Sequence, residues 1–564
     1  MDFDTSNSTS HRMRTGGEAL VEQLIAEGVT KVFGIPGIQL DWAVEALRAN
    51  ADRIDFVVPR HEQAASYMAD GYARTTGKEG VCMVVPGPGM LNALSGIATA
   101  YACSSRVLFL VGQIDSGAIG KGHGLLHELP DQSAILRGLC KWHALAERPE
   151  DVARLVHEAF AELRSGHPRP VAIELPADVL QAVAASLTYP RAPEAPTAPD
   201  SDRIEQAATL LANARFPVIQ AGGGAAAAGA SEAIRALAEQ LQAPVVMTEG
   251  GRGVLDDRHP LALTTLGGRA VMPHADVVLV LGSRFVNALG QASYALEATR
   301  YIYVNLDEGH ASGPRSDGLS IAADVRLTAE ALLAALPERK HQAATDRGAP
   351  VKRWAAEQLQ QIQPQWSFAQ ALRAGMADED ILVSELTQIG YYSTIGFPVH
   401  GPRRYVTPGY QGTLGYGFNT ALGAAHGNPE NRVVSINGDG GFAWGMQELA
   451  TAARDQCAIS IVVFVDGHYG NVRRIQNATF GKEFAVELTN PDFALLARAY
   501  GIPECNTDSP EGLLNALEEA QKRGGPALIT VTVGAMPSPW GLIHDFVPIG
   551  FEVPANPLGE PETV

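Results

Sequence analysis

The chain has 564 residues, of which 46% are hydrophobic and 19% are charged, and its formal net charge is −19. That length exceeds what a single hydrophobic core supports, so we expect roughly two to four domains. The acidic balance argues against nucleic acid or an anionic membrane surface as a partner. No apolar run is long enough to span a bilayer, which also argues against a membrane partner.

The compartment is predicted from the cysteines and the N-terminus. Five cysteines occur without a CxxC spacing, so neither a disulfide framework nor a zinc site is expected. Residues 1–12 are polar and lack the apolar core of a signal peptide. We therefore expect a cytoplasmic protein.

The first part of the chain alternates short β-rich apolar runs with amphipathic helices. Strands are predicted at 31–33, 55–59, 80–85, 106–111 and 171–175. Helices are predicted at 19–27, 41–49, 64–75 and 89–102. This alternation is typical of a parallel sheet that is covered by helices on both faces. We therefore predict a doubly wound first domain.

Two later parts of the chain repeat this alternation. The second part begins with a helix at 204–214, and its strands are predicted at 217–220, 244–247, 277–281 and 301–305. In the third part, strands are predicted at 381–384, 433–436, 459–465 and 527–533. The predicted fold class is therefore α/β, with three doubly wound parallel-sheet domains.

Two segments of unusual composition separate these domains. Residues 189–203 are rich in proline and are predicted to form a semi-rigid linker, and residues 337–365 form a charged, alanine-rich connector. The predicted domains span 16–188, 204–336 and 366–545, and flexible tails are expected at 1–15 and 546–564.

The strand at 433–436 runs into the glycine-rich turn NGDGG at 437–441, and a helix is predicted at 445–454. Backbone N–H groups of such a turn suit a phosphate. Asp439, a carboxylate within the turn, is compatible with a phosphate only if a hard cation such as Mg²⁺ neutralises both. Asp466, at the end of the next apolar run, is the natural second ligand. We therefore predict a metal-bridged diphosphate at the ends of neighbouring strands, with an ordinary glycine turn as the alternative.

Two motifs of the first domain lie where strands lead into helices. Glu62 stands directly before an alanine-rich helix, where it either caps the helix or exchanges a proton with a ligand ring nitrogen. Its position alone favours the cap. The turn PGPG at 86–89 allows a flat ligand to approach the backbone closely, and the alternative is a tight corner without a ligand.

Five motifs taken together resemble, in order and in spacing, the thiamine diphosphate enzymes of the acetolactate synthase-like superfamily. They are RHEQAASYMADGYAR at 60–74, PGPGMLNALSGIATAYA at 86–102, GTLGYG at 412–417, GDGG at 438–441 and VDGHYG at 465–470. The resemblance covers nearly the whole chain. It implies a pyrimidine-binding, a central and a diphosphate-binding domain, with thiamine diphosphate and Mg²⁺ as cofactors.

The activity implied by this resemblance is that of a carbon–carbon lyase or carboligase. Its substrates would be pyruvate-like 2-oxo acids, or acyloins and 1,2-diketones, and the reaction would pass through an enamine. The alternatives are an acetolactate synthase proper and a catalytically silent scaffold of the same fold. The implied assembly is a homodimer or homotetramer in which different chains hold the pyrimidine and the diphosphate.

The resemblance implies roles for residues around the pyrimidine. Glu62 would hydrogen-bond the pyrimidine ring and so start proton removal from the cofactor. Leu414 would hold the cofactor bent, and the carbonyl of Gly412 would receive its amino group. Pro88 and Asn92 would contact the pyrimidine.

The other implied residues surround the diphosphate. Asp439, Asp466 and the backbone carbonyl of His468 match the Mg²⁺ ligands. The residues that would line the cofactor are Leu386, Gln388, Gly438, Gly440, Gly441 and Asn471. At the last of these positions acetolactate synthases have methionine.

Several positions depart from the acetolactate synthases. Asp466 replaces the usual asparagine ligand, and Ile475 replaces a tryptophan that selects the acceptor. Ala177 replaces a lysine, and His127 replaces a glutamine of the active-site channel. These changes predict a sister enzyme with a different acceptor.

Two residues of the first domain are further candidates for the catalytic site. His127 is either an acid–base group or a loop histidine that hydrogen-bonds Glu128 or solvent. Gln113, at the end of a strand, is included as a residue that supports the site.

The central domain raises the question of FAD. Residues at the flavin-binding positions of relatives are Gly222, Gly223, Gly224, Thr248, Leu266, Arg284 and Asp307. The methionine–histidine pair usual in flavin-binding relatives is replaced by glycines at 267–268, so the sequence favours a protein without FAD. An NAD-type dehydrogenase is also disfavoured, because no acidic residue follows Gly224 at the spacing needed for a ribose.

Overall fold

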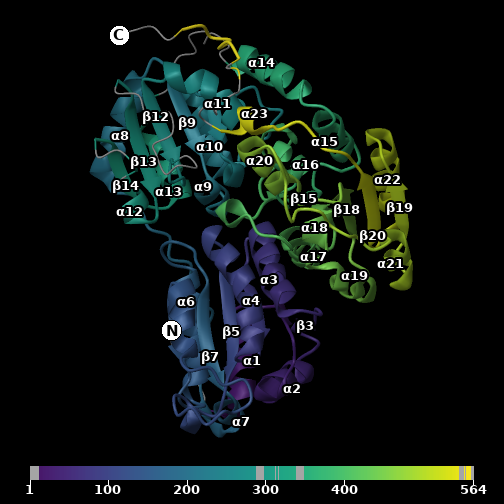
Figure 1. Ribbon diagram of the computed structural model, residues 1–564. Coiled ribbons are helices and arrows are strands. Elements are labelled where there is room, and N and C mark those ends of the chain that lie inside the picture. The colour runs from purple at the N-terminus through teal and green to yellow at the C-terminus, as the bar shows by residue number, and fades with distance from the viewer. Residues whose placement is uncertain are drawn as a thin grey trace. The chain divides into compact units, whose positions relative to one another are not determined.

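The structure is a computed structural model that describes residues 12–286, 298–311, 313–314, 317–337, 348–544, 552 and 554–560 (Figure 1). The chain divides into two compact units, Met1–Ala195 and Pro196–Val564. Parts of the predicted tails, at 1–11, 546–551, 553 and 561–564, and of the predicted connector, at 338–347, lie outside the described residues. Within the described part of the chain, no helix combines the length and the apolar character needed to cross a membrane.

The first unit is built on a six-stranded parallel sheet with the strand order β3-β2-β4-β5-β7-β6. Its strands are β2 (Lys31–Gly34), β3 (Asp55–Val57), β4 (Gly80–Val84), β5 (Val107–Gln113), β6 (Trp142–Leu145) and β7 (Val171–Pro176). Its helices are α1 (Gly16–Ala26), α2 (Asp41–Ala49), α3 (Glu62–Thr76), α4 (Pro88–Ala102), α5 (Gln132–Leu139), α6 (Asp151–Leu163) and α7 (Ala177–Gln181). Strands β4, β5 and β7 are buried along their whole length, as expected for a sheet covered on both faces.

The motifs of this unit lie at the carboxyl ends of its strands. From β2 the chain moves outward to β3 and returns to β4 on the other side of β2. Open α/β sheets bind their ligands at such a switch point. The turn at 86–89 follows β4, and Glu62 follows β3 at the start of α3. Helices α3 and α4 pack against each other, which places their first turns together (Figure 1).

Residues 12–15 form a strand, although the sequence predicted a flexible tail up to residue 15. This strand, β1 (Arg12–Thr15), pairs antiparallel with β8 (Val183–Ser186). Thr15 and Glu18 then form a capping box, in which each side chain accepts the backbone N–H of the other residue. The pairing joins segments far apart in the sequence, and local composition does not reveal such pairing.

The first part of the predicted linker is attached to the first unit. The N–H of Tyr189 donates to the Gln23 side chain at 2.7 Å, and the N–H of Ala192 donates to Glu27 at 2.9 Å. Glu27 is itself buried in an ion pair with Arg164. Buried polar groups therefore hold this segment along the unit, in addition to the stiffness of its prolines.

The second unit contains two six-stranded parallel sheets. The central sheet has the order β11-β10-β9-β12-β13-β14. Its strands are β9 (Pro217–Ala221), β10 (Val245–Met247), β11 (Ala262–Thr264), β12 (Val277–Leu281), β13 (Arg300–Asn305) and β14 (Leu319–Ala322). The accompanying helices are α8 (Ser201–Asn213), α9 (Gly223–Ala227), α10 (Ser231–Leu241), α11 (Thr265–Val271), α12 (Glu308–Ala311) and α13 (Val325–Ala335).

The glycines considered for FAD have a packing role in this sheet. A Cβ on Gly222 would lie 2.4 Å from the carbonyl oxygen of Gly282, and a Cβ on Gly224 would lie 2.8 Å from the Gly282 Cα. Close backbone packing at the ends of β9 and β12 therefore accounts for both glycines without a ligand.

The last sheet has the order β16-β15-β17-β18-β20-β19. Its strands are β15 (Ile381–Ser384), β16 (Tyr405–Val406), β17 (Val433–Gly438), β18 (Ile459–Val465), β19 (Glu504–Thr507) and β20 (Ala527–Thr532). The helices are α15 (Gln365–Ala374), α16 (Gln388–Gly396), α17 (Tyr416–Gly427), α18 (Asp439–Phe442), α19 (Leu449–Asp455), α20 (Gly470–Phe480), α21 (Phe493–Ala499), α22 (Pro510–Arg523) and α23 (Trp540–Ile543). Helix α14 (Gly348–Gln360) precedes them and packs mainly against α11 and β11 of the central sheet. The switch point of this sheet lies between β15 and β17.

The fold class predicted from the sequence is confirmed by three parallel sheets, each combined with helices. The strands that were not predicted in these sheets are β6, β11, β14, β16 and β19, and each lies at a sheet edge. The exact domain boundaries stay a prediction.

Candidate active site

Asp439 begins a helix at the end of β17. The sequence predicted a helix at 445–454, which overlaps α19 (Leu449–Asp455), but it did not predict α18, which starts at Asp439 and ends after 4 residues. Asp439 is only 1% exposed. Its Oδ1 accepts the Gly440 N–H at 2.9 Å, and its Oδ2 accepts the Gly467 N–H at 2.8 Å and the Asn490 amide at 2.6 Å. These bonds fix the carboxylate at the carboxyl ends of β17 and β18.

Asp466 follows the neighbouring strand, β18. Its Oδ1 accepts the His468 N–H at 3.0 Å, and its Oδ2 accepts the Gln388 amide at 2.7 Å. Because Gly467 donates its N–H to Asp439, the two carboxylates are neighbours. Burial and the nearby charge of Asp439 raise the pKa of Asp466.

This pair of carboxylates fits a divalent cation. Neighbouring carboxylates repel each other unless a proton or a cation neutralises them. The carbonyl oxygen of His468 accepts no hydrogen bond from a described residue, so it can serve as a third oxygen ligand. Mg²⁺ prefers oxygen ligands of these kinds. The structure therefore brings together Asp439, Asp466 and His468, the three residues predicted to bind metal.

Packing explains two glycines of the turn after β17. A Cβ on Gly441 would lie 1.9 Å from the carboxylate of Glu385, and a Cβ on Gly440 would lie 2.8 Å from the Tyr469 ring. At Gly438 the nearest contact of such a Cβ would be 3.3 Å. Packing therefore favours glycine at 440 and 441, whether or not the turn also holds a diphosphate.

Glu385 is a buried carboxylate that was not singled out from the sequence. It follows β15, is 3% exposed, and accepts the N–H groups of Gly415 at 2.7 Å and Tyr416 at 3.2 Å. Its other oxygen accepts the Gly438 N–H at 3.4 Å. Burial raises the pKa of Glu385 to about 7, although the N–H donors act to lower it. Glu385 therefore joins the loop at 412–417 to the turn after β17.

The loop at 412–417 lies against Leu386. Gly412 has a φ of +54°, and a Cβ at this position would lie 3.2 Å from the Leu386 side chain. Leu414 is 38% exposed. The structure thus brings two predicted cofactor residues, Gly412 and Leu386, together and leaves the apolar side chain of Leu414 accessible.

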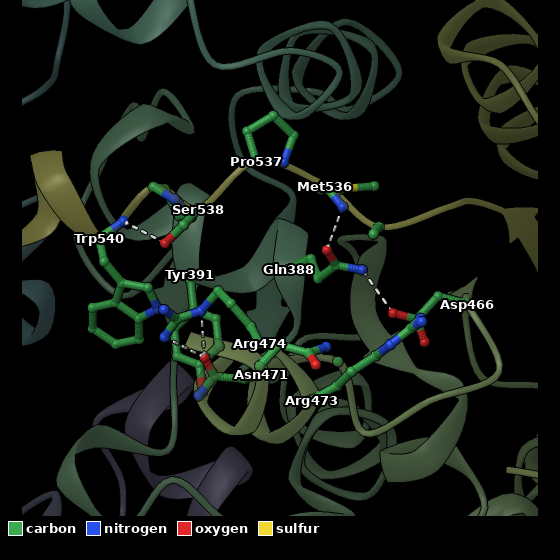
Figure 2. A pocket seen from close by; sticks show the side chains of 14 residues that line it. Gln388, Tyr391, Asp466, Asn471, Arg473, Arg474, Met536, Pro537, Ser538 and Trp540 are labelled. Atoms are coloured by element: carbon green, nitrogen blue, oxygen red, sulfur yellow. Dashed lines mark hydrogen bonds between the residues drawn. The ribbon is translucent and has the colours of Figure 1, made fainter. Parts of the chain in front are cut away.

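Gln388, Asp466 and Asn471 line a cavity of about 310 Å³ (Figure 2). The amide nitrogen of Gln388 donates to Asp466 at 2.7 Å, and its oxygen accepts the Met536 N–H at 2.7 Å. Ile475, which stands where acetolactate synthases have the selective tryptophan, is not among the residues that line this cavity. Three of the predicted residues therefore share one cavity in the second unit.

Glu62 and Asn92 meet in the first unit. Glu62 is the first residue of α3, but the N-cap is His61, whose Nδ1 accepts the Gln63 N–H at 3.1 Å. The Glu62 carboxylate instead accepts the Asn92 amide at 3.1 Å. Pro88 is the first residue of α4, the helix that carries Asn92. The sequence position favoured Glu62 as the cap of this helix, but the structure has His61 as the cap.

Gln113 belongs to a buried hydrogen-bond network in the first unit. Its amide donates to Glu174 at 2.8 Å, and the amide of Gln132 donates to the same carboxylate at 2.8 Å. Gln132 in turn accepts the N–H of Gly87, within the turn at 86–89, at 3.2 Å. Gln113 therefore supports this turn from behind, through Glu174 and Gln132.

His127 lies in the loop before α5 and has a left-handed backbone conformation, with a φ of +70°. Its carbonyl oxygen would lie 2.5 Å from a Cβ on Gly87. Its Nδ1 is buried and has no hydrogen-bond partner among the described residues. Glu128, a possible partner, accepts the Leu125 N–H at 2.8 Å instead. The proton-transfer role of His127 stays a prediction.

Three models of thiamine pyrophosphate enzyme domains match the chain: the N-terminal TPP binding domain at 14–135, the central domain at 204–332 and the C-terminal TPP binding domain at 388–531. The chain is 36% identical to the probable 2-ketoarginine decarboxylase AruI of Pseudomonas aeruginosa, over 88% of this chain and 90% of that protein. It is 32% identical to the probable acetolactate synthase large subunit of Methanocaldococcus jannaschii, over 92% of each chain. It is 31% identical to the acetolactate synthase isozyme 1 large subunit of Escherichia coli, over 94% of this chain and 96% of that protein. The chain therefore belongs to the thiamine pyrophosphate enzyme family, as an acetolactate synthase-like enzyme that depends on thiamine diphosphate.

Proposed function

We propose that this enzyme makes or breaks a carbon–carbon bond next to the carbonyl group of a 2-oxo acid, with Mg²⁺ as its second cofactor. The observation that carries the proposal is the pair of carboxylates, Asp439 and Asp466, at the ends of two neighbouring strands. Together with the His468 carbonyl, these oxygens suit a cation that links the protein to a diphosphate. Acyloins and 1,2-diketones are included as substrates, because cleavage next to their carbonyl group is the same chemistry.

The two ends of thiamine diphosphate would meet different residues. Glu62 would hold a proton at a pyrimidine nitrogen, and Asn92, which donates to Glu62 at 3.1 Å, would orient that carboxylate. Leu414 would offer an apolar surface to the cofactor. When bound, thiamine diphosphate supplies a carbon nucleophile and a cationic ring that accepts electrons. The residues of the chain would therefore position groups and move a proton.

His127 is proposed to exchange a proton with the substrate carbonyl oxygen. Its buried Nδ1 lacks a partner among the described residues, and imidazole is the side chain best suited to proton transfer near neutral pH. His127→Asn would then lower kcat about 100-fold and leave the affinity for thiamine diphosphate unchanged. An unchanged kcat would assign His127 to the loop structure alone.

The relatives suggest two reactions that an assay must distinguish. One relative is named as a decarboxylase of 2-ketoarginine, and others are named as acetolactate synthases. Decarboxylation releases CO₂ and an aldehyde, whereas a synthase transfers the remaining fragment to a second carbonyl compound. Ile475 in place of the acceptor-selecting tryptophan favours a product other than acetolactate.

Product analysis of the purified enzyme tests the proposal. The substrates are pyruvate, 2-oxobutyrate, 2-ketoarginine, acetoin and diacetyl, each with and without thiamine diphosphate and Mg²⁺. Consumption of at least one of them only in the presence of both cofactors is the expected result. If none is consumed, a silent scaffold of the same fold becomes the better explanation.

We also propose a cytoplasmic homodimer or homotetramer that works without FAD. Two of the three glycines at the flavin positions, Gly222 and Gly224, are explained by packing against Gly282, so they do not require a dinucleotide. The absorption spectrum of the purified protein tests this point, since bound flavin has visible bands. Sedimentation analysis of the same sample measures the oligomeric state.

A further inference from the structure

Arg474 is a cation in the wall of the cavity of Figure 2 that no described carboxylate neutralises. It lies on α20 and is half-buried. Its Nε and Nη2 donate to Asn471 Oδ1 at 3.3 and 3.0 Å, and these are its hydrogen bonds to described residues. The adjacent Arg473 differs, because it forms an ion pair with Glu483. Of these two arginines, only Arg474 therefore keeps its charge available to a ligand.

The guanidinium of Arg474 is held in place by its neighbours. The Oδ1 of Asn471 accepts the hydrogen bonds of Arg474, and the Nδ2 of Asn471 donates to the Tyr391 hydroxyl at 3.2 Å. The guanidinium carbon lies 6.0 Å from the centre of the Trp540 ring, and this ring lies 4.7 Å from that of Tyr391. A side chain fixed by an amide and an aromatic wall loses little freedom on binding a ligand.

The cavity has groups of opposite charge in different places. Figure 2 shows Arg474, Asn471, Tyr391 and Trp540 grouped on one side, and Asp466 on the other. Asp466 belongs to the proposed metal site, so an anion bound at Arg474 would be separate from the metal ligands. A guanidinium presents paired N–H donors that match a carboxylate.

The chemistry of the reaction indicates which carboxylate of a substrate Arg474 would bind. A 2-oxo acid that loses CO₂ loses the negative charge of its first carboxylate in the transition state. A strong ion pair with that group would stabilise the bound substrate more than the transition state and so slow the reaction. An arginine therefore favours turnover when it binds a carboxylate that persists throughout.

We propose that Arg474 binds a second carboxylate of the substrate, so that the enzyme selects 2-oxo acids with two acidic groups over those with a neutral or cationic tail. This inference rests on the proposed function and narrows its substrate class. Arg474 is thus a specificity residue, and Asn471 is the residue that positions it.

Calorimetry on the enzyme loaded with thiamine diphosphate and Mg²⁺ tests the inference without turnover. Glutarate and glutaramate are suitable probes, because they differ only in one carboxylate that becomes an amide. The wild type is expected to bind glutarate at least about tenfold more tightly, as a charge-assisted pair provides. Arg474→Gln is expected to abolish this preference. Arg498→Gln, which removes the same charge from an exposed pair with Glu504, is expected to keep it.

Three results would overturn the assignment: equal binding of the two probes by the wild type, an unchanged preference in Arg474→Gln, or a loss of thiamine diphosphate affinity in that variant with glutarate binding intact. The last result would assign Arg474 to the diphosphate. Turnover of 2-oxoglutarate and 2-oxoglutaramate is measured in parallel. If the binding preference depends on Arg474 but no 2-oxo acid is consumed, the anion site stands and the proposed function fails.

Discussion

Asp466 adds a second carboxylate to the proposed metal site, where acetolactate synthases have asparagine. Burial and the charge of Asp439 raise the pKa of Asp466, so the pair needs a proton or a cation. Asp466→Asn keeps an oxygen ligand and removes one negative charge. We expect this variant to stay active and to bind Mg²⁺ about tenfold more weakly, as measured by titrating activity with Mg²⁺.

The matched variant is Asp439→Asn. Both oxygens of Asp439 already accept backbone N–H groups, so an amide nitrogen at this position would face a donor. This variant is expected to lose the cofactor. If Asp466→Asn also loses all binding of thiamine diphosphate, the idea that asparagine can replace aspartate as the ligand at position 466 is refuted.

Glu385 gives a stability effect with a defined direction in pH. The pKa of Glu385 is about 7 in the folded chain and 4.5 in an ordinary glutamate. Between pH 4.5 and 7 the folded state therefore holds a proton that the unfolded state has released. Stability contributed by this group is complete below pH 4.5 and is lost as the pH rises towards 7. The loss is about 3 kcal/mol at most.

The comparison with Glu385→Gln isolates this effect. The amide keeps the size of the side chain and does not titrate, so the wild type should become less stable relative to the variant as the pH rises from 5 to 7. Thermal unfolding of the cofactor-free proteins measures the difference. A difference that stays constant over this range would show that Glu385 is ionised throughout.

The site residues differ in how far the sequence could predict them. Asp439 and Asp466 were predictable because each follows an apolar strand within a glycine-containing turn. Glu385 also follows such a strand, but its partners are backbone N–H groups, which any residue can supply. The contact of Glu62 with Asn92 joins two helices, and only the family resemblance placed both residues at the cofactor.

The turn after β17 packs tightly enough to make a substitution there informative. A Cβ on Gly441 would lie 1.9 Å from Glu385, so Gly441→Ala must displace the turn or the carboxylate. We expect a loss of about 1–3 kcal/mol in stability and weaker binding of thiamine diphosphate. Chemical unfolding and cofactor titration measure the two effects.

Gly138→Ala is the control for this change. Gly138 lies in α5, and a Cβ there would meet no atom within 4 Å. The control should be neutral or more stable by about 0.5–1 kcal/mol, since alanine favours a helix. Gly441→Ala behaving like this control in both measurements would contradict the tight packing of the turn.

At the scale of the elements, the sequence predicted all the central strands but only one edge strand, β3, and it missed the other five. Strands β4, β12, β17 and β18 are almost entirely buried, and most of their residues are apolar. The edge strand β19, Glu504–Thr507, has no fully buried residue, so its composition resembles that of a loop. A strand that is buried on both faces is rich in apolar residues, so it can be predicted from the sequence.

For the whole molecule, the proposed assembly predicts complementation between inactive variants. Glu62→Gln removes the pyrimidine partner, and Asp439→Asn removes a metal ligand. If one site takes Glu62 from one chain and Asp439 from another, mixed dimers regain one intact site. Refolding the two variants together should restore about a quarter of the wild-type activity, since half of the dimers are mixed.

Each variant refolded alone is the control and should stay inactive. The proposal is contradicted if the two variants are shown to form mixed dimers and the mixture stays inactive. Glu62 and Asp439 would then not come from different chains of one active site.

A crystal structure with thiamine diphosphate and Mg²⁺ would show whether the two carboxylates and Glu62 hold the cofactor as proposed. We expect Mg²⁺ at about 2.1 Å from oxygens of Asp439, Asp466 and the His468 carbonyl, with the pyrimidine against Glu62 of a neighbouring subunit. A metal ion bound elsewhere, or a pyrimidine remote from every Glu62 in the assembly, would contradict it.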